Sequence, residues 1–187
     1  MSGLGIAKVR NVGRIQSLFG QPGKQLLFVT IGKKESYAPI LYLEPEAPKN
    51  QTWCLVQAGT DAQVKTNGHY ICSYPNLSHY LRLSEHDINP LDSEAFCHIE
   101  AVELPSPLIE GGPLPDLGHG ARFSVQLAQN ATSGDKAGYS IVALNNRSAV
   151  LQAGTRESEP WPGMRVCAHS QKGDARELWL LEKSLTD

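Results

Sequence analysis

The chain repeats itself, because residues 53–83 are echoed by residues 123–153, seventy positions further along. Within the echo, the segment Gly68-His-Tyr-Ile-Cys-Ser-Tyr-Pro-Asn-Leu-Ser-His-Tyr-Leu aligns without a gap on Gly138-Tyr-Ser-Ile-Val-Ala-Leu-Asn-Asn-Arg-Ser-Ala-Val-Leu. A repeat of this length indicates that one supersecondary unit is used more than once. We therefore expect an architecture built on pseudo-symmetry.

Apolar and polar residues alternate in short segments bounded by turn residues, a pattern typical of β-strands. Four such segments occur three times over, and the strands are expected at 6–12, 26–31, 40–44, 52–57, 69–73, 80–83, 95–102, 122–127, 139–144, 149–153, 164–169 and 178–182. Each group closes on an aromatic residue, Trp53, Phe123 or Trp179, and we expect these three rings to be buried anchors. Helical periodicity is nearly absent.

The composition is that of a folded protein with many turns. Of 187 residues, 41% are hydrophobic and 19% are charged, and there are 17 glycines and 12 prolines. This length fits a single domain, residues 1–187, with repeats over about 1–57, 58–127 and 128–187. No apolar run is long enough to span a membrane, and no signal-peptide pattern is present. We therefore expect a cytoplasmic or unconventionally secreted protein, with its four cysteines reduced.

The last repeat resembles the ricin-B type of β-trefoil. Its Tyr139-Ser-Ile strand, its Gly163-Met-Arg-Val strand and its Glu177-Leu-Trp179 ending follow that family's Tyr-x-Ile, Gly-x-x-Val and Gln-x-Trp motifs. The first repeat ends in Gln51-Thr-Trp53, whereas the ending of the second, Ala121-Arg-Phe123, is eroded. The resemblance implies an all-β fold in which three quasi-equivalent four-stranded repeats form a closed barrel with a hairpin cap. It also implies lectin-like recognition of glycans through shallow sites on the repeats, and a fungal-like source.

Sugar sites of that family use an Asp after the Leu of the second strand, an aromatic platform and an amide. Here Arg82 and Gln152 follow Leu81 and Leu151, so a conventional galactose pocket is not expected. A shifted glycan site is expected in the third repeat, formed by Gln152, Glu157, Trp161, Arg165 and His169. The matching group in the second repeat is Arg82, His86, Asp87 and His98, with Tyr74 and Tyr80 nearby. The alternative for Trp161 is that it packs over the base of the barrel.

Residues 103–120 form a proline-rich insertion between the third and fourth strands of the second repeat, and loops of this length are usually functional or disordered. One hypothesis is protease inhibition, since Pro39-Ile-Leu-Tyr-Leu-Glu-Pro and Gln51-Thr-Trp53 are similar to fungal β-trefoil protease inhibitors, whose loops enter an active site. The contact residues would be Leu104, Pro105, Pro107, Leu108, Ile109 and Leu114. The other hypothesis is a strap over the hydrophobic end of the barrel. A second insertion, residues 13–24, is a further contact candidate.

Other functional classes lack their motifs. The chain has no G-x-S-x-G or H-E-x-x-H motif, no glycine-rich phosphate loop opening a helix, and no metal-ligand spacing among its six histidines. A net charge of −2 argues against nucleic-acid binding, although residues 1–34 hold six basic side chains and no acidic one. We expect a protein that is not an enzyme and uses no cofactor or metal. Its partners would be glycans or glycoproteins, alternatively a protease, and a third hypothesis is a protein-interaction subunit with neither activity.

Overall fold

The computed structural model describes residues 5–18, 26–35, 38–45, 51–59, 68–84, 97–133, 136–144, 149–154, 164–170, 173 and 175–181. In this part of the chain the strands are β1 (Val9–Gly13), β2 (Ile15–Ser17), β3 (Phe28–Glu35), β4 (Ala38–Glu44), β5 (Trp53–Gln57), β6 (His69–Ser73), β7 (His79–Leu83), β8 (Cys97–Glu103), β9 (Phe123–Ser133), β10 (Lys136–Ala143), β11 (Ala149–Ala153), β12 (Met164–Ser170) and β13 (Trp179–Leu181). Two 3₁₀ helices, η1 (His119–Ala121) and η2 (Ala175–Glu177), complete the elements. No helix among these residues is long and apolar enough to cross a bilayer.

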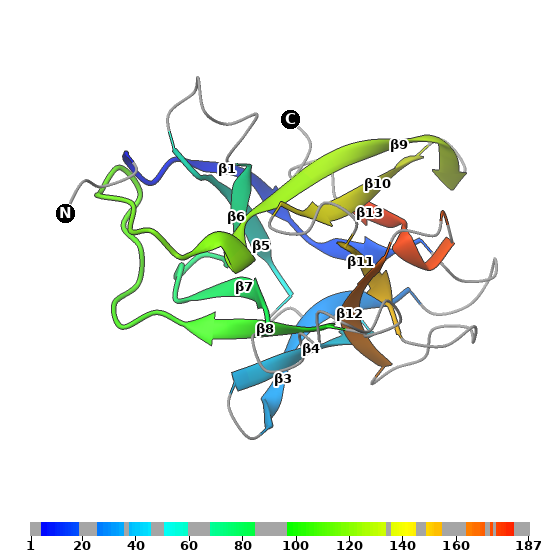
Figure 1. The fold of residues 1–187 in the computed structure, drawn as a ribbon, viewed down its shortest axis with the longest axis horizontal. Helices are drawn as coiled ribbons and strands as arrows, with labels where there is room; N and C mark the ends of the chain where they lie inside the picture. The colour runs from blue at the N-terminus through cyan, green and yellow to red at the C-terminus, as the bar shows by residue number, and fades with distance from the viewer. Residues whose placement is uncertain are drawn as a thin grey trace.

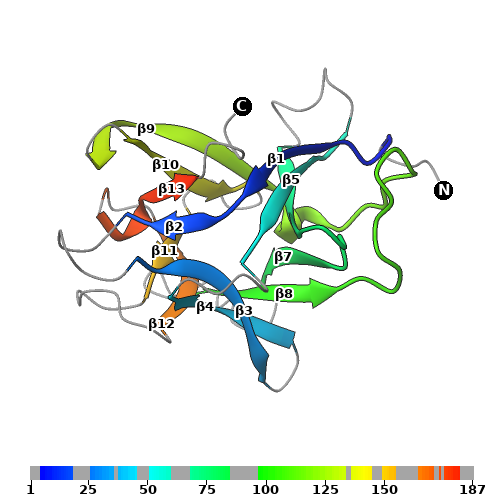
Figure 2. The ribbon, with the colours of Figure 1, turned by 180° about the vertical axis from the view of Figure 1, so that it is seen from behind.

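Seven of the thirteen described strands pair in a ring (Figures 1 and 2). β1 pairs with β5, β5 with β6, β6 with β9, β9 with β10, and β10 with β13, all antiparallel. β13 then pairs with β2, which continues β1 after the single residue Arg14. The pairings therefore return to the strand from which they began.

The other strands form three hairpins, β3–β4, β7–β8 and β11–β12. The second strands of these hairpins also pair with one another: β4 pairs with β8 and with β12, and β8 pairs with β12. They therefore meet in a triangle, which we call the cap. A ring carrying three mutually paired hairpins is the threefold pseudo-symmetry that the sequence repeat predicts.

The three aromatic anchors lie at the centre of the core. Trp53, Phe123 and Trp179 are all 0% exposed and belong to one hydrophobic cluster with residues of every hairpin. The indole Nε1 of Trp53 donates a hydrogen bond to the carbonyl oxygen of Val29 at 3.0 Å, and that of Trp179 donates to Leu151 at 3.0 Å. The predicted anchoring role is confirmed, and two of the three anchors also tie a ring strand to the hairpin of their own repeat.

The residue two places before each tryptophan is buried as well, which explains the motif. Gln51 Nε2 donates to Thr30 Oγ1 at 2.9 Å and to the carbonyl oxygen of Pro45 at 2.7 Å. In the last repeat, Glu177 Oε2 accepts a hydrogen bond from the amide of Gly173 at 3.1 Å. Both side chains satisfy polar groups beside the core that would be costly to leave without a partner.

All of the expected strands are found, with two differences. The prediction of an insertion at residues 13–24 is wrong in its first part, because Ile15–Ser17 is strand β2, Ile15 is 2% exposed, and residues 19–24 lie outside the described residues. Arg14 interrupts the alternation there, and its guanidinium carbon lies 4.4 Å from the ring centre of Phe28. Strand β9 also runs on to Ser133, so the expected repeat boundary at residue 127 falls inside a strand.

Candidate functional site

The side chains predicted for the third-repeat site do not gather on the surface. Gln152 on β11 is 2% exposed and donates from Nε2 to the carbonyl oxygen of Gly154 at 3.0 Å. His169 on β12 is 4% exposed, with Nδ1 3.1 Å from the carbonyl oxygen of Ser170. Burial removes both from contact with a ligand at the surface, whereas Arg165 is exposed. Glu157 and Trp161 lie outside the described residues, as do His86 and Asp87 of the second-repeat group.

Residues 104–118, which we call the strap, cover the outer face of β5 and β6. The inward side chains of these strands join the main core, but their outward side chains form a second buried cluster with the strap: Cys54, Val56, Tyr70, Cys72, Leu104, Leu108 and Leu114. Leu104, Leu108 and Leu114 are 8%, 9% and 1% exposed. Both faces of β5 are thus buried, and these three leucines attach the loop to the ring strands.

Backbone hydrogen bonds hold the strap at several points. The amides of Leu104 and Leu108 donate to the carbonyl oxygens of Ser78 and Leu77 at 2.8 and 3.1 Å. Near its middle the strap pairs with the segment before β1, where Ala7 donates to Gly112 at 2.7 Å and Gly111 donates to Ala7 at 2.8 Å. Between these attachments Pro105, Pro107 and Ile109 are exposed, and Ile109 is 75% accessible.

An ionic cluster secures the end of the strap. Arg122 Nη2 donates to Asp116 Oδ1 at 3.3 Å, and the Gly118 amide donates to the same oxygen at 2.9 Å. The Leu117 amide donates to the Tyr70 hydroxyl at 3.4 Å. The Gly118 hydrogen bond, and then Arg122, lower the pKa of Asp116, while burial raises the pKa of Tyr70. The loop at residues 103–120 is thus tied down, as the strap hypothesis expects, but it covers the outer face of two ring strands and not the end of the barrel.

An ion pair distinguishes the second repeat. Arg82 on β7 lies opposite Glu100 on β8, and Arg82 Nη2 donates to Glu100 Oε2 at 3.1 Å. The Arg82 side chain is 26% exposed and that of Glu100 is 7% exposed. The pair lies on the face of the hairpin turned away from the core, since the alternate residues Leu81, Leu83 and Ile99 point inward. A guanidinium beside a carboxylate offers donors and an acceptor together, which suits a polyhydroxylated ligand.

Each of the three hairpins has a pair of facing residues at the position equivalent to Arg82 and Glu100. On the first strand of the hairpin, this position comes one residue before a side chain that points into the core. The three facing pairs are Arg82 with Glu100, Gln152 with Cys167, and Thr30 with Tyr42. In the third repeat the pair is neutral and buried, with Gln152 Nε2 3.8 Å from Cys167 Sγ. Opposite charges therefore occupy this place in the second repeat alone.

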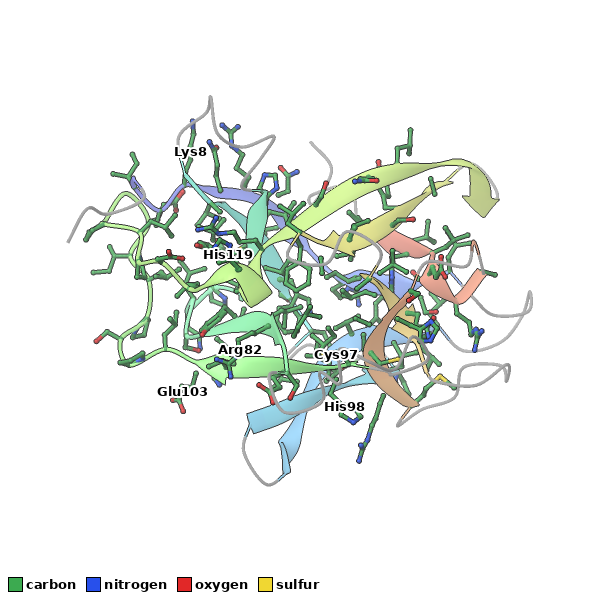
Figure 3. The ribbon with its side chains drawn as sticks, in the orientation of Figure 1. Lys8, Arg82, Cys97, His98, Glu103 and His119 are labelled. Carbon is green, nitrogen blue, oxygen red and sulfur yellow. The ribbon has the colours of Figure 1, made fainter. Side chains whose placement is uncertain are left out.

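Two further residues of the second-repeat prediction lie on the same hairpin (Figure 3). His98 is partly exposed on β8, two residues before Glu100 and on the same face, beside the half-buried Cys97. Tyr80 is 8% exposed and packs under the strap, so it is not a surface platform. Tyr74 is 39% exposed in the turn between β6 and β7. The structure thus pairs Arg82 with Glu100 and places His98 two residues before Glu100 on the same strand.

The thiols and histidines do not form a metal site in the described part of the chain, where no three His, Cys, Asp or Glu side chains are grouped suitably. Burial raises the pKa of Cys54 and of Cys167 to about 12, and raises that of Cys72 well above its ordinary value. Such thiols stay protonated near neutral pH and are poor nucleophiles and poor metal ligands.

Several solved structures are similar to the chain, and three of them are described here. A mosquitocidal holotoxin superposes with a TM-score of 0.62 at 14% identity, over 93% of this chain and 17% of the toxin chain. ThreeFoil, a designed threefold symmetric protein, superposes with a TM-score of 0.59 at 12% identity, over 91% of this chain and 98% of its own. The lysenin pore gives a TM-score of 0.50 at 9% identity, over 95% and 49%. The chain spans less than a fifth of the holotoxin chain.

The chain has a β-trefoil fold. ThreeFoil matches it over nearly its own full length, and the ring with three paired hairpins is found here strand by strand. No family model and no curated protein matches the sequence, so membership of the ricin-B family, a fungal source and the protease-inhibitor link stay predictions. Identities this low indicate the trefoil scaffold alone, because one fold carries many unrelated functions.

Glu100 is the residue of the charged pair that the sequence analysis missed. The signal was present in the alternation His98-Ile99-Glu100-Ala101, which turns His98 and Glu100 away from the core. What the sequence does not show is the register between β7 and β8 that places Glu100, and not His98, directly opposite Arg82.

Proposed function

We propose that this β-trefoil is a non-catalytic glycan-binding protein, and that its binding surface is the outer face of hairpin β7–β8. The observation that carries the proposal is the partly exposed Arg82, which the buried Glu100 holds in an ion pair, at a place where the other repeats have neutral pairs. A guanidinium donates hydrogen bonds to sugar hydroxyls, and its ion pair with the carboxylate fixes the direction in which Arg82 presents its remaining donors.

The position of the pair adds support. It follows Leu81, which is where the family that the last repeat resembles keeps the carboxylate of its sugar site. Here the acidic group comes from the facing strand, and Arg82 occupies the position after the leucine. The proposed site therefore preserves a carboxylate at this end of the hairpin by a different residue. Burial of Leu104, Leu108 and Leu114 gives no comparable support to inhibition of a protease.

The test is a glycan array probed with labelled wild-type protein and with the double variant Arg82→Gln/Glu100→Gln. The double variant keeps a hydrogen-bonding pair but removes both charges, so that no unpaired buried carboxylate remains. We expect binding that falls by at least about tenfold in the double variant, the size of one charge-assisted hydrogen bond.

A Trp161→Ala variant serves as the control for the third repeat, where the sequence predicted the site. Loss of binding in Trp161→Ala, with the double variant unaffected, would move the site to the third repeat. If the folded wild-type protein binds no glycan on the array, the proposal of glycan binding is itself overturned. Circular dichroism of each variant verifies that it is folded.

A further inference from the structure

Two cysteines face each other beneath the strap. Cys54 on β5 lies directly opposite Cys72 on β6 in the antiparallel register. Both side chains are 0% exposed, and both belong to the second buried cluster, on the outward face of the ring strands. Directly opposite residues on one face are the closest side-chain neighbours that two strands provide. Neither cysteine is in a disulfide, so two thiols are placed where they can react with each other.

The register brings the two cysteines within reach of a disulfide bond, but not to its ideal geometry. The amide of Tyr74 donates to the carbonyl oxygen of Thr52 at 2.9 Å, and hydrogen-bonded pairs alternate along an antiparallel ladder. Cys54 and Cys72, two residues along, are therefore also a hydrogen-bonded pair, with Cα atoms about 5.5 Å apart, which suits a disulfide. Their Cβ atoms, about 4.5–5.5 Å apart, must approach to about 3.8 Å. A disulfide that draws the strands together in this way is strained and therefore easily reduced.

The strap covers these thiols and lowers their reactivity. Leu108 and Leu114 of the strap belong to the same buried cluster as the two cysteines. Burial, and next the negative charge of Glu110, raise the pKa of Cys54 to about 12, while a hydrogen bond to the backbone of Cys72 lowers it. Burial also raises the pKa of Cys72 well above its ordinary value. Because Glu110 is part of the strap, displacement of the strap would remove both the burial and the neighbouring charge, and would make the thiols more reactive.

We propose that Cys54 and Cys72 are a redox site, which forms a reversible disulfide bond with oxidised glutathione as the oxidant when the strap is displaced. The thiolate of one cysteine attacks a sulfur of oxidised glutathione, which releases one glutathione thiolate and leaves a mixed disulfide. The thiolate of the other cysteine attacks the protein sulfur of that mixed disulfide and releases the second glutathione. The protein thus loses two electrons and two protons, and oxidised glutathione gains them. This site is separate from the glycan-binding surface proposed above and does not depend on it.

The test incubates folded protein with oxidised glutathione at about pH 8, blocks the remaining thiols with N-ethylmaleimide, and maps disulfides by non-reducing peptide mass spectrometry. Trypsin separates the two cysteines into peptides 50–65 and 66–82, so the bond would join these peptides. Every protein in the test carries Cys97→Ser, because Cys97 is partly exposed and would itself react with the oxidant. We expect the joined peptides to accumulate with time, and to separate again when the oxidised protein is placed in an excess of reduced glutathione.

Leu114→Ala tests the role of the strap, because this side chain is 1% exposed and attaches the strap beside the cysteines. The bond should form about tenfold faster in this variant or more, since a weaker attachment lets the strap open more often. Leu108→Ala is a second, milder variant for the case in which Leu114→Ala does not fold. Ile109→Ala is the matched control, because it shortens a strap side chain that is 75% exposed and should change the rate by no more than about twofold. Circular dichroism verifies that each variant is folded.

Each outcome decides the proposal. Joined peptides that form faster in the leucine variants than in Ile109→Ala, and that separate in reduced glutathione, support it. Absence of the joined peptides in every folded variant, or glutathione adducts on Cys54 or Cys72 that never proceed to the joined peptides, would overturn it, because the facing thiols would then be unable to close the bond. Equal rates in the leucine variants and in Ile109→Ala would overturn the dependence on the strap.

Discussion

Two contributions to stability, packing and a side-chain hydrogen bond, can be compared at one position of the repeat. This position is occupied by Trp53, Phe123 and Trp179, which are quasi-equivalent but differ in chemistry. All three fill the core, but an indole N–H reaches a hairpin carbonyl only in the first and third repeats. The second repeat therefore indicates that packing alone suffices at this position, and that the hydrogen bond is an addition.

Replacing any of these rings by alanine should lower the free energy of unfolding by about 3–5 kcal/mol, through lost burial and the cavity that remains. Trp53→Phe keeps a ring and gives up the bond to Val29, so it should cost less, about 1–3 kcal/mol. Urea denaturation of the four variants checks this. A Trp53→Phe variant as unstable as Trp53→Ala would contradict the secondary role of the hydrogen bond.

The cysteines should differ sharply in reactivity. Cys54, Cys72 and Cys167 are fully buried with raised pKa values, so their thiols stay protonated at about pH 8. Cys97 is partly exposed, with Sγ 3.3 Å from the carbonyl oxygen of Ser84. Limited iodoacetamide treatment followed by peptide mass spectrometry should find the label on Cys97 first. Labelling of all four is expected only after unfolding in guanidinium chloride, and equal labelling of the native protein would speak against this burial.

Among the structural elements, the strap breaks the threefold symmetry most strongly. It occupies the connection between β8 and β9, and turns the outer face of β5 and β6 from a solvent-facing surface into a second core. Because one end is anchored by leucines and the other by an ionic cluster, its two ends should respond to different perturbations.

The buried leucines of the strap should contribute far more to the free energy of unfolding than the exposed residues between them. Leu114→Ala removes a side chain that is 1% exposed and should cost about 2–5 kcal/mol. Ile109→Ala removes one that is 75% exposed and should change stability by no more than about 0.5 kcal/mol. Thermal melts of the two variants make the comparison. Similar effects of the two would mean that the strap is not packed as described.

The ionic end of the strap should be sensitive to pH. The pKa of Asp116 is lowered from 3.8 in the folded protein, so its ionised form stabilises the fold above that value, and the contribution is lost as pH falls through the folded pKa. Wild type should therefore melt above Asp116→Asn at neutral pH, by a small margin because the carboxylate is 59% exposed. The gap should close in acid well below pH 3.8. A gap that widens in acid would reverse the assigned sign.

Local pattern was sufficient to predict most elements, for identifiable reasons. Alternation marks a strand wherever one face is buried, and the repeat supplied the number of hairpins. Strand β2 was not predicted, because Arg14 interrupts the alternation and leaves only the three residues Ile15–Ser17 to indicate a strand. The strap was seen as an insertion, but the choice between a projecting loop and a cover depends on which sheet face its leucines meet, and that is a tertiary contact.

At the scale of the whole molecule, the pseudo-symmetry brings strands of different repeats together at the cap. Arg82 and Arg165 are far apart in sequence and belong to different repeats, yet their hairpins meet where β8 and β12 pair with β4. The sequence analysis divided these residues into two separate groups, because nothing in the chain states how β8 and β12 are aligned. For the same reason it could not see that Gln152 and His169 would be buried.

The facing pair of the second repeat has a consequence for valency. With neutral residues at the two equivalent places, the proposed site exists once per chain. A protein with one site cannot bridge two cells or two glycoproteins by itself, so red-cell agglutination should require association of several copies or an added tethering partner.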